Sequence, residues 1–179
     1  MKTLEFLKKY KLYITIIIIG IIIDALTKTY MVSKATGLWM LTGDPNSISP
    51  DGILFQPPIT SFFNLSLVFN KGVSFSMLTN HSELGRWLLF FMSIVITIFL
   101  VLIFKEEKNK TNRILIALAI SGALGNAIDR LRFGAVVDFL DFHAYGHHWP
   151  SFNIADMLIV IGIGILVTRQ IIKKDNIEK

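Results

Sequence analysis

Four apolar runs constrain this chain more than any other feature, because each is long enough to cross a bilayer as a helix. A spanning helix needs about 20 mostly apolar residues, and such runs occur at about 13–31, 87–104, 114–131 and 153–168. Hydrophobic residues make up 53% of the 179 residues and the mean hydropathy is +0.57, which is too apolar for a soluble domain of this length. Isoleucine-rich stretches also occur in buried strands, but the length and flanks of these runs favour helices. We therefore expect an all-α membrane protein with four transmembrane helices.

Basic side chains indicate how these spans are oriented. They gather before the first run, between the second and third, and after the fourth, at Lys2, Lys8, Lys9, Lys11, Lys105, Lys108, Lys110, Arg113, Arg169, Lys173, Lys174 and Lys179. Short loops rich in Lys and Arg stay in the cytoplasm. The pattern predicts cytoplasmic N- and C-termini, with residues 32–86 and about 132–152 on the outer side. It does not resemble a basic patch for nucleic acid, so we expect no nucleic-acid partner.

An alternative for the first run is a signal peptide that is cleaved after the "SKA" at 33–35. Asp24 and Lys28 would then lie between the apolar run and the cut, and removal would leave three helices with the new N-terminus outside. We therefore treat the run as a span. No repeat or low-complexity tract interrupts the chain, and residues 1–179 are expected to form a single membrane domain.

The outer segments contain two kinds of pattern. Residues 34–58 hold four prolines and predict an irregular loop. Within 63–70, apolar residues alternate with others at a period of two, which is typical of a strand with one apolar face. The "NKG" at 70–72 supplies a turn, and the alternation resumes at 73–77. We expect a β region at about 60–78, as a hairpin or small sheet on the outer membrane surface.

Polar residues inside the spans are the candidates for function, because an ionisable group at the centre of a membrane helix costs roughly 2.5–3.5 kcal/mol. Given the predicted orientation, all of them lie toward the outer side: Asp24, Lys28, Asn126, Asp129, Arg130, Asn153 and Asp156. Asp138 and Asp141 lie in the outer loop that is expected to follow the third span. The sequence therefore predicts that these groups meet in one layer near the outer surface.

Each group also has a simpler explanation. Asn153 can cap a helix with Asp156 at its third position. Asp24 and Lys28, spaced i and i+4, can form a structural ion pair. Asp129 and Arg130 can anchor a helix end at the interface. These explanations leave unexplained why so many polar groups share one layer.

Metal and cofactor chemistry find little support. The sequence has no cysteine, which excludes disulfides, thiolate nucleophiles and cysteine-ligated metals. His143, His147 and His148 lie near Asp141, but their spacing is irregular and not that of a histidine pair on one helix face. With no phosphate-binding loop either, we expect no metal and no cofactor.

Five short blocks resemble the lipoprotein signal peptidases of bacteria, also called type II signal peptidases. In chain order they are "DALTK" (24–28), "NKGVSFS" (70–76), "GALGNAIDR" (122–130), "VVDF" (136–139) and "FNIAD" (152–156). The resemblance covers about residues 20–160. Ser74 and Ala25 depart from the residues usual in the family, and the segment 34–58 is longer than its minimum.

The resemblance implies an aspartic endopeptidase that removes the signal peptide from diacylglyceryl-modified prolipoproteins, just before the lipidated cysteine. It implies that Asp138 and Asp156 are catalytic, whereas spacing alone also leaves Asp129 and Asp141 open. The supporting residues that it implies are Asn70, Gly72, Asn126, Arg130, Asn153, Asp24 and Lys28. Such a dyad shares a proton and activates water, without a metal or a nucleotide.

The resemblance further implies a multi-pass protein of the bacterial cytoplasmic (inner) membrane with its active site at the outer leaflet. Its partners would be the lipidated prolipoprotein and membrane lipid, and a monomer is expected. Two alternatives are an ion- or proton-coupled transporter subunit that uses Asp24, Asp129 and Asp156, and a small scaffold protein without activity. Transport predicts charges through the whole depth of the membrane, whereas here they gather on one side.

Overall fold

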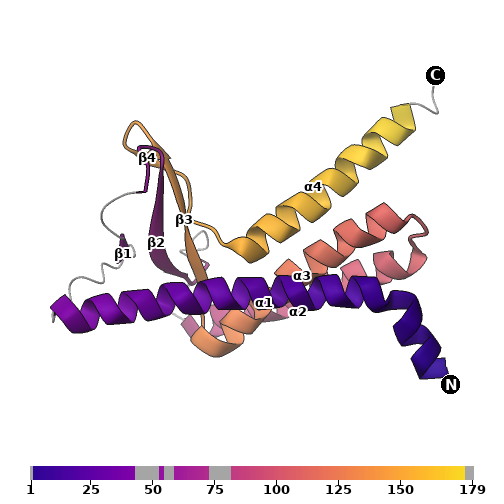
Figure 1. Cartoon of the computed structure of the whole chain (residues 1–179), viewed down its shortest axis with the longest axis horizontal. Helices are drawn as coiled ribbons and strands as arrows, with labels where there is room; N and C mark the ends of the chain where they lie inside the picture. The colour runs from indigo at the N-terminus through magenta and orange to yellow at the C-terminus, as the bar shows by residue number, and fades with distance from the viewer. Residues whose placement is uncertain (1, 43–52, 55–58, 73–81, 176–179) are drawn as a thin grey trace.

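The computed structural model describes residues 2–42, 53–54, 59–72 and 82–175 (Figure 1). Four helices form most of it: α1 (Lys2–Thr42), α2 (Ser82–Glu106), α3 (Lys110–Phe133) and α4 (Ile154–Asp175). Each contains an apolar stretch long enough to cross a membrane, at Lys8–Ala35, Leu84–Glu106, Lys110–Phe133 and Ile154–Lys173. The prediction of four membrane helices is therefore confirmed.

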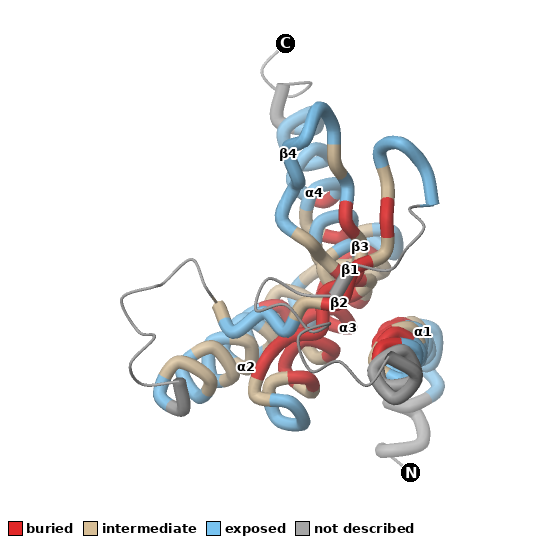
Figure 2. The backbone as a smooth tube through the Cα atoms, turned by 90° about the vertical axis from the view of Figure 1, so that its left-hand side faces the viewer, coloured by how far each residue is buried: buried red, intermediate tan, exposed pale blue. Residues whose placement is uncertain are grey.

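Helix α3 is the central helix, and it contacts α1, α2 and α4. About 67% of its apolar window is buried inside the molecule, against 11–22% for the other three helices. Small residues allow this close approach, among them Ala117, Ala119 and Ala123, which are nearly inaccessible. Figure 2 shows the buried backbone gathered along α3 and the side of α1 that faces it.

The outer helix faces are apolar and exposed. On α2, Phe91, Val95 and Phe99 each expose more than half of their surface. So large an apolar surface is rare on a soluble monomer. Surrounding lipid is the solvent that suits it.

A small antiparallel sheet adjoins one end of the helices (Figure 1). Its strands are β1 (Ile53–Leu54), β2 (Phe63–Asn70), β3 (Val136–Ala144) and β4 (His147–His148), in that order. β2 and β3 pair from Phe63 opposite Phe142 to Asn70 opposite Val136, with an irregularity between Leu65 and Val68. A buried cluster joins the sheet to α1, formed by Met31, Ala35, Leu67, Val137 and Phe139.

Three details of the sequence prediction are corrected. Residues 34–42 continue α1, because the first proline of the segment is Pro45 and nothing before it breaks a helix. Residues 136–144 form β3, although they were expected to be loop. The strand at 63–70 is confirmed, but its neighbours are β1 and β3. The predicted second strand at 73–77 lies outside the described residues.

Candidate active site

The start of α4 positions Asn153 and Asp156. Oδ1 of Asn153 accepts a hydrogen bond of 2.9 Å from the backbone N–H of Asp156, and Oδ2 of Asp156 accepts one of 3.2 Å from the backbone N–H of Asn153. This reciprocal pair is a capping box that satisfies free amides at the helix start. The capping explanation is therefore correct, yet Nδ2 of Asn153 and Oδ1 of Asp156 remain available for other partners.

Strand β3 carries Asp138 to the same place. The Asp138 side chain is buried, and its Oδ1 accepts a hydrogen bond of 2.7 Å from Nδ2 of Asn153. Its Oδ2 accepts one of 2.9 Å from Nδ2 of Asn70, at the end of β2. Asn153 therefore contacts both aspartates. It bonds to the side chain of Asp138, and it bonds to both the backbone and the side chain of Asp156.

The electrostatic surroundings of Asp138 favour its protonated form. Burial raises the pKa of Asp138 to about 6, from an ordinary value of 3.8. The hydrogen bond from Asn70 lowers the pKa, the negative charge of Asp156 raises it, and the hydrogen bond from Asn153 and the charge of Lys28 lower it. The net result is a carboxyl that holds its proton more readily than an ordinary aspartate.

Asn126 of α3 connects this pair to a second cluster. Its Nδ2 donates a hydrogen bond of 2.7 Å to Oδ1 of Asp156. Its Oδ1 accepts from Nδ2 of Asn153 and from Nζ of Lys28, both at 3.2 Å. Because donors reach the oxygen and an acceptor meets the nitrogen, the orientation of this amide follows from its partners.

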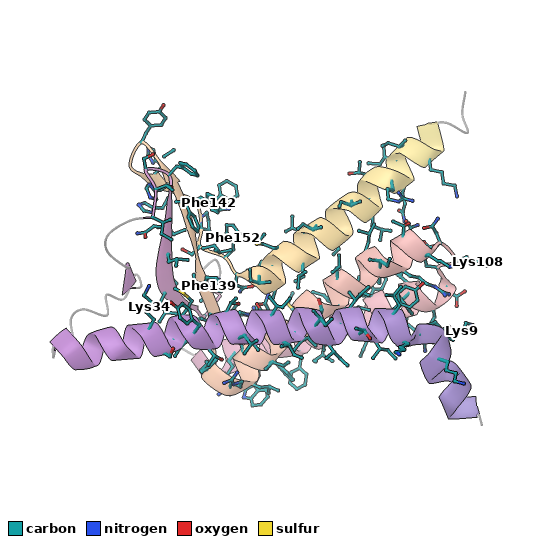
Figure 3. The ribbon with its side chains drawn as sticks, viewed as in Figure 1. Lys9, Lys34, Lys108, Phe139, Phe142 and Phe152 are labelled. Atoms are coloured by element: carbon teal, nitrogen blue, oxygen red, sulfur yellow. The ribbon has the colours of Figure 1, made fainter. Side chains whose placement is uncertain are left out.

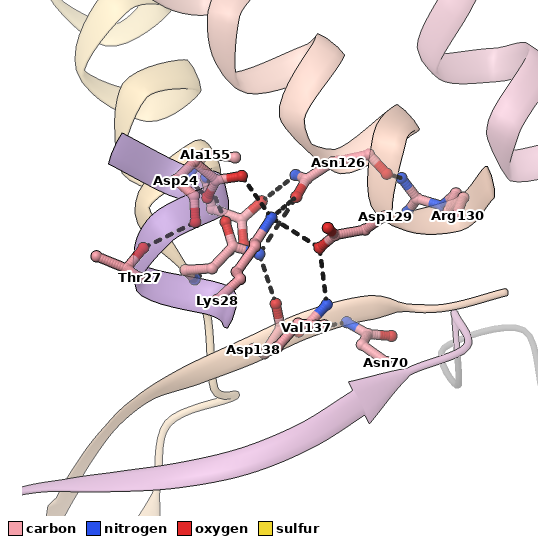
Figure 4. Close-up of polar contacts among 12 residues, drawn as sticks. Asp24, Thr27, Lys28, Asn70, Asn126, Asp129, Arg130, Val137, Asp138 and Ala155 are labelled. Atoms are coloured by element: carbon pink, nitrogen blue, oxygen red, sulfur yellow. Dashed lines mark hydrogen bonds and ion pairs between the residues drawn. The ribbon is translucent and has the colours of Figure 1, made fainter. Parts of the chain in front are cut away.

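Lys28 is the centre of the second cluster (Figure 4). Its ammonium lies 2.8 Å from Oδ2 of Asp24 and 2.8 Å from Oδ2 of Asp129, and all three side chains are buried. Together with Asn126, these two carboxylates supply an acceptor for each of the three ammonium hydrogens. Asp24 also accepts from the backbone N–H of Ala155 at 2.9 Å, and Asp129 from that of Val137 at 3.1 Å. The cluster therefore ties α1 and α3 to the start of α4 and to β3.

Arg130 lies at the edge of the site. Its Nη1 donates to Oγ of Ser93 at 3.2 Å and to the backbone oxygen of Asn126 at 3.4 Å. Its guanidinium is within electrostatic reach of Asp156, Asp138 and Asp129. Among the side chains that the structure describes, Nε of Arg130 is the one buried polar atom without a hydrogen-bond partner.

Gly72 contributes through its backbone. Its N–H donates a hydrogen bond of 2.8 Å to Oδ1 of Asn70, which leaves Nδ2 of Asn70 pointing to Asp138. Its φ of 80° lies in the left-handed region that glycine adopts without strain, and a Cβ there would meet the side chain of Leu89 on α2. Gly72 thus shapes the turn that holds Asn70.

The other aspartates are used elsewhere. Asp141 faces His148, whose Nδ1 lies 2.8 Å and 3.0 Å from its two oxygens, and Asp129 is paired with Lys28. In the described part of the chain, no group of three or more His, Asp or Glu side chains is arranged to hold a metal ion. Two contributors were not singled out from the sequence, Ser93 and Arg86. Their seven-residue spacing, which places both on one face of α2, is the sequence signal that could have identified them.

The network draws on α1, α3, α4 and the sheet at once. It includes each residue that the sequence suggested for the site: Asp24, Lys28, Asn70, Gly72, Asn126, Arg130, Asp138, Asn153 and Asp156. Chemically, the arrangement offers two neighbouring carboxyl groups, one with a raised pKa, and a guanidinium with an unused donor. These are the groups that acid–base hydrolysis needs.

Known proteins resemble the chain over most of its length. The family model described as signal peptidase (SPase) II matches residues 16–172. A protein named lipoprotein signal peptidase from Azoarcus sp. (strain BH72) is 45% identical over 117 residues, which cover 64% of this chain and 65% of that protein. Another so named, from Polynucleobacter necessarius subsp. necessarius (strain STIR1), is 34% identical over 168 residues, which cover 93% and 91% of the two chains. The match thus spans just under two thirds of the first of these relatives and nearly all of the second.

A solved structure is similar as well. It is a bacterial membrane enzyme determined by the in meso method at 1.9 Å resolution, and it superposes with a TM-score of 0.69 at 30% identity. The superposition covers 91% of this chain and 94% of the other. All five sequence blocks lie within the residues that the family model matches. The chain belongs to the signal peptidase II family.

Proposed function

We propose that this protein is an aspartic endopeptidase that removes the signal peptide from diacylglyceryl-modified prolipoproteins, cutting just before the lipidated cysteine. The proposal assigns the chemistry to Asp138 and Asp156. The observation that carries it is the position of Asn153, which donates to the carboxyl of Asp138 at 2.7 Å and caps α4 together with Asp156. One amide side chain thus holds the two carboxyl groups as a pair.

The mechanism follows from the different surroundings of the two groups. Asp138, with its raised pKa, holds the shared proton and donates a hydrogen bond to the scissile carbonyl oxygen. Asp156 acts as the general base and takes a proton from a water molecule as the water oxygen bonds to the carbonyl carbon. The tetrahedral intermediate then collapses, the C–N bond breaks, and the proton held by Asp156 passes to the leaving nitrogen. The products are a carboxyl group on the signal peptide and a free amino group on the lipidated cysteine.

The remaining residues position this pair. Asn70 and Asn153 each donate to Asp138, and Asn126 donates to Asp156. Gly72 fixes Asn70, and Asp24 and Lys28 fix Asn126 and the start of α4. In this proposal Arg130 offers its unpartnered Nε to the substrate backbone next to the dyad.

We place the site at the outer leaflet of the cytoplasmic membrane. Lys9 and Lys108 lie at the end of the helices away from the sheet, while Phe139, Phe142 and Phe152 lie at the sheet end (Figure 3). Since basic loops stay in the cytoplasm, the sheet and the dyad face outward. A diacylglyceryl cysteine is anchored in that same leaflet, so the bond to be cut lies at the depth of Asp138 and Asp156.

The direct test is to incubate the purified protein in lipid with a diacylglyceryl-modified prolipoprotein and to measure release of the signal peptide. The wild-type protein is expected to cleave it and to leave the unlipidated precursor uncut. Asp138→Asn and Asp156→Asn are each expected to abolish cleavage, because neither can exchange a proton with water or substrate.

Asp141→Asn is the matched control, since Asp141 is also a buried aspartate of β3 but faces His148. It is expected to cleave at close to the wild-type rate. Near-normal turnover by either dyad variant contradicts the assignment. Solute flux in proteoliposomes without cleavage would support a transporter instead.

A further inference from the structure

Two polar side chains of α2 contact Arg130. Arg86 donates from Nε to the backbone oxygen of Arg130 at 2.9 Å and from Nη2 to that of Leu131 at 2.8 Å. Ser93, seven residues later, accepts from Nη1 of Arg130 at 3.2 Å. A spacing of seven residues is nearly two helical turns, so both side chains lie on the face of α2 that meets α3. α2 thus holds Arg130 by its backbone and by its side chain.

The hydroxyl of Ser93 is oriented for this contact. It donates its hydrogen to the backbone oxygen of Leu89 at 2.9 Å. The lone pairs of its oxygen are therefore left to accept from Arg130. The hydroxyl of Thr97, one turn further along, likewise donates to the backbone oxygen of Ser93 at 2.8 Å. For Thr97 this local bond satisfies the hydroxyl inside an apolar helix, which is the ordinary reason for such residues in membrane helices. Ser93 makes the further contact with Arg130.

Fixing Nη1 of Arg130 decides where the rest of the guanidinium points. The group is planar and its donors have a rigid geometry, so a contact at one nitrogen sets the plane of the others. The backbone oxygen of Asn126 holds the same Nη1 at 3.4 Å. The same guanidinium interacts electrostatically with Asp156 and Asp138, and its buried Nε has no hydrogen-bond partner, so the group that Ser93 holds still has a donor to offer.

We propose that Ser93 is a positioning residue for cleavage, which acts by orienting the guanidinium of Arg130, while Arg86 holds the backbone of Arg130 in place. The inference rests on the proposed function, because it assumes that Arg130 contacts the substrate beside the dyad. It adds α2 to the elements that build the site and gives a role to Ser93, whose hydroxyl contacts α3.

The test measures single-turnover cleavage of the lipidated prolipoprotein, with the protein in excess, first for three single variants of α2. Ser93→Ala is expected to cleave about tenfold more slowly than the wild type, which is the loss typical of one hydrogen bond to a charged group. Ser93→Thr restores the hydroxyl and is expected to recover most of the rate. Thr97→Ala, the matched control one turn away, is expected to keep the wild-type rate.

A double-mutant comparison separates positioning from general destabilisation. In an Arg130→Lys background, Ser93→Ala is expected to cause no further loss, because lysine offers no planar group to orient. An equal loss in both backgrounds, or a wild-type rate for Ser93→Ala, overturns the proposal. Where Arg130→Lys leaves no measurable rate, the comparison of Ser93→Ala with Ser93→Thr and Thr97→Ala decides. Asp138→Asn in the same assay reports on the proposed function separately: if it remains active, the dyad assignment fails, whatever Ser93 does.

Discussion

The side-chain amide of Asn153 lies 2.7 Å from Oδ1 of Asp138, although Asn153 caps the start of α4 and Asp138 lies in β3. The same residue caps α4 through its Oδ1. One asparagine therefore combines a local role, which stabilises the helix start, with a long-range role, which places a carboxyl group.

Substitution of Asn153 separates these two roles. Asn153→Ala removes both, and we expect a loss of activity smaller than that of either dyad variant, because Asn70 still holds Asp138. Asn153→Ser keeps an N-cap oxygen but lacks the amide donor, so it is expected to unfold like the wild type and to cleave as slowly as Asn153→Ala. Cleavage rates and thermal unfolding in detergent check this. A serine variant with wild-type activity would show that only the cap matters.

The pH dependence of cleavage follows from Asp138. With a pKa of about 6, Asp138 loses the proton that the mechanism needs as the pH rises through this value. We therefore expect kcat/KM, which reports the free enzyme, to fall above about pH 6. Because the hydrogen bond from Asn70 lowers the pKa of Asp138, Asn70→Ala is expected to move this descending limb of the pH profile to higher pH. A limb that stays in place, or moves to lower pH, would contradict the assignment of the proton to Asp138.

Lys28 is expected to be required for stability as well as for activity. Lys28→Met leaves two buried carboxylates without their cation and should lower the free energy of unfolding by about 3–5 kcal/mol. The triple variant Lys28→Met, Asp24→Asn, Asp129→Asn removes the charges together and should recover much of this stability, yet remain slow because Asn126 has lost a partner. Denaturant titration in mixed micelles measures the first effect and the cleavage assay the second. Lys8→Met, an exposed lysine of α1, is the control.

The contact between α3 and α4 depends on Gly122. A Cβ at this position would meet the backbone oxygen of Ala155 and the side chain of Ile159, so Gly122→Ala forces the helices apart. We expect a destabilisation of about 1–3 kcal/mol and a marked loss of cleavage, since the start of α4 carries Asn153 and Asp156. Gly164→Ala on α4 is the matched control, because a Cβ there meets nothing within 4 Å. Equal behaviour of the two variants would contradict close packing at Gly122.

The sequence by itself determined the local features. Length and hydropathy identified four spanning helices, period-two alternation identified β2, and the i, i+4 spacing of Asp24 and Lys28 predicted their ion pair. The capping of α4 by Asn153 was also visible, because an N-cap involves residues three apart. All of these interactions lie within one turn or one strand, so their partners can be recognised from spacing.

Only the tertiary structure decided which partners meet across the chain. β2 pairs with β3 about 70 residues away, and the side chain of Asn70 donates to that of Asp138 across 68 positions. Lys28 bonds to Asn126 across 98 positions and also binds Asp129, and α2 reaches Arg130 through Ser93 across 37. Spacing carries no information about such pairs, because they depend on how helices and strands pack. The physical reason is that a buried charge takes whichever partner the packed helices bring within hydrogen-bonding distance.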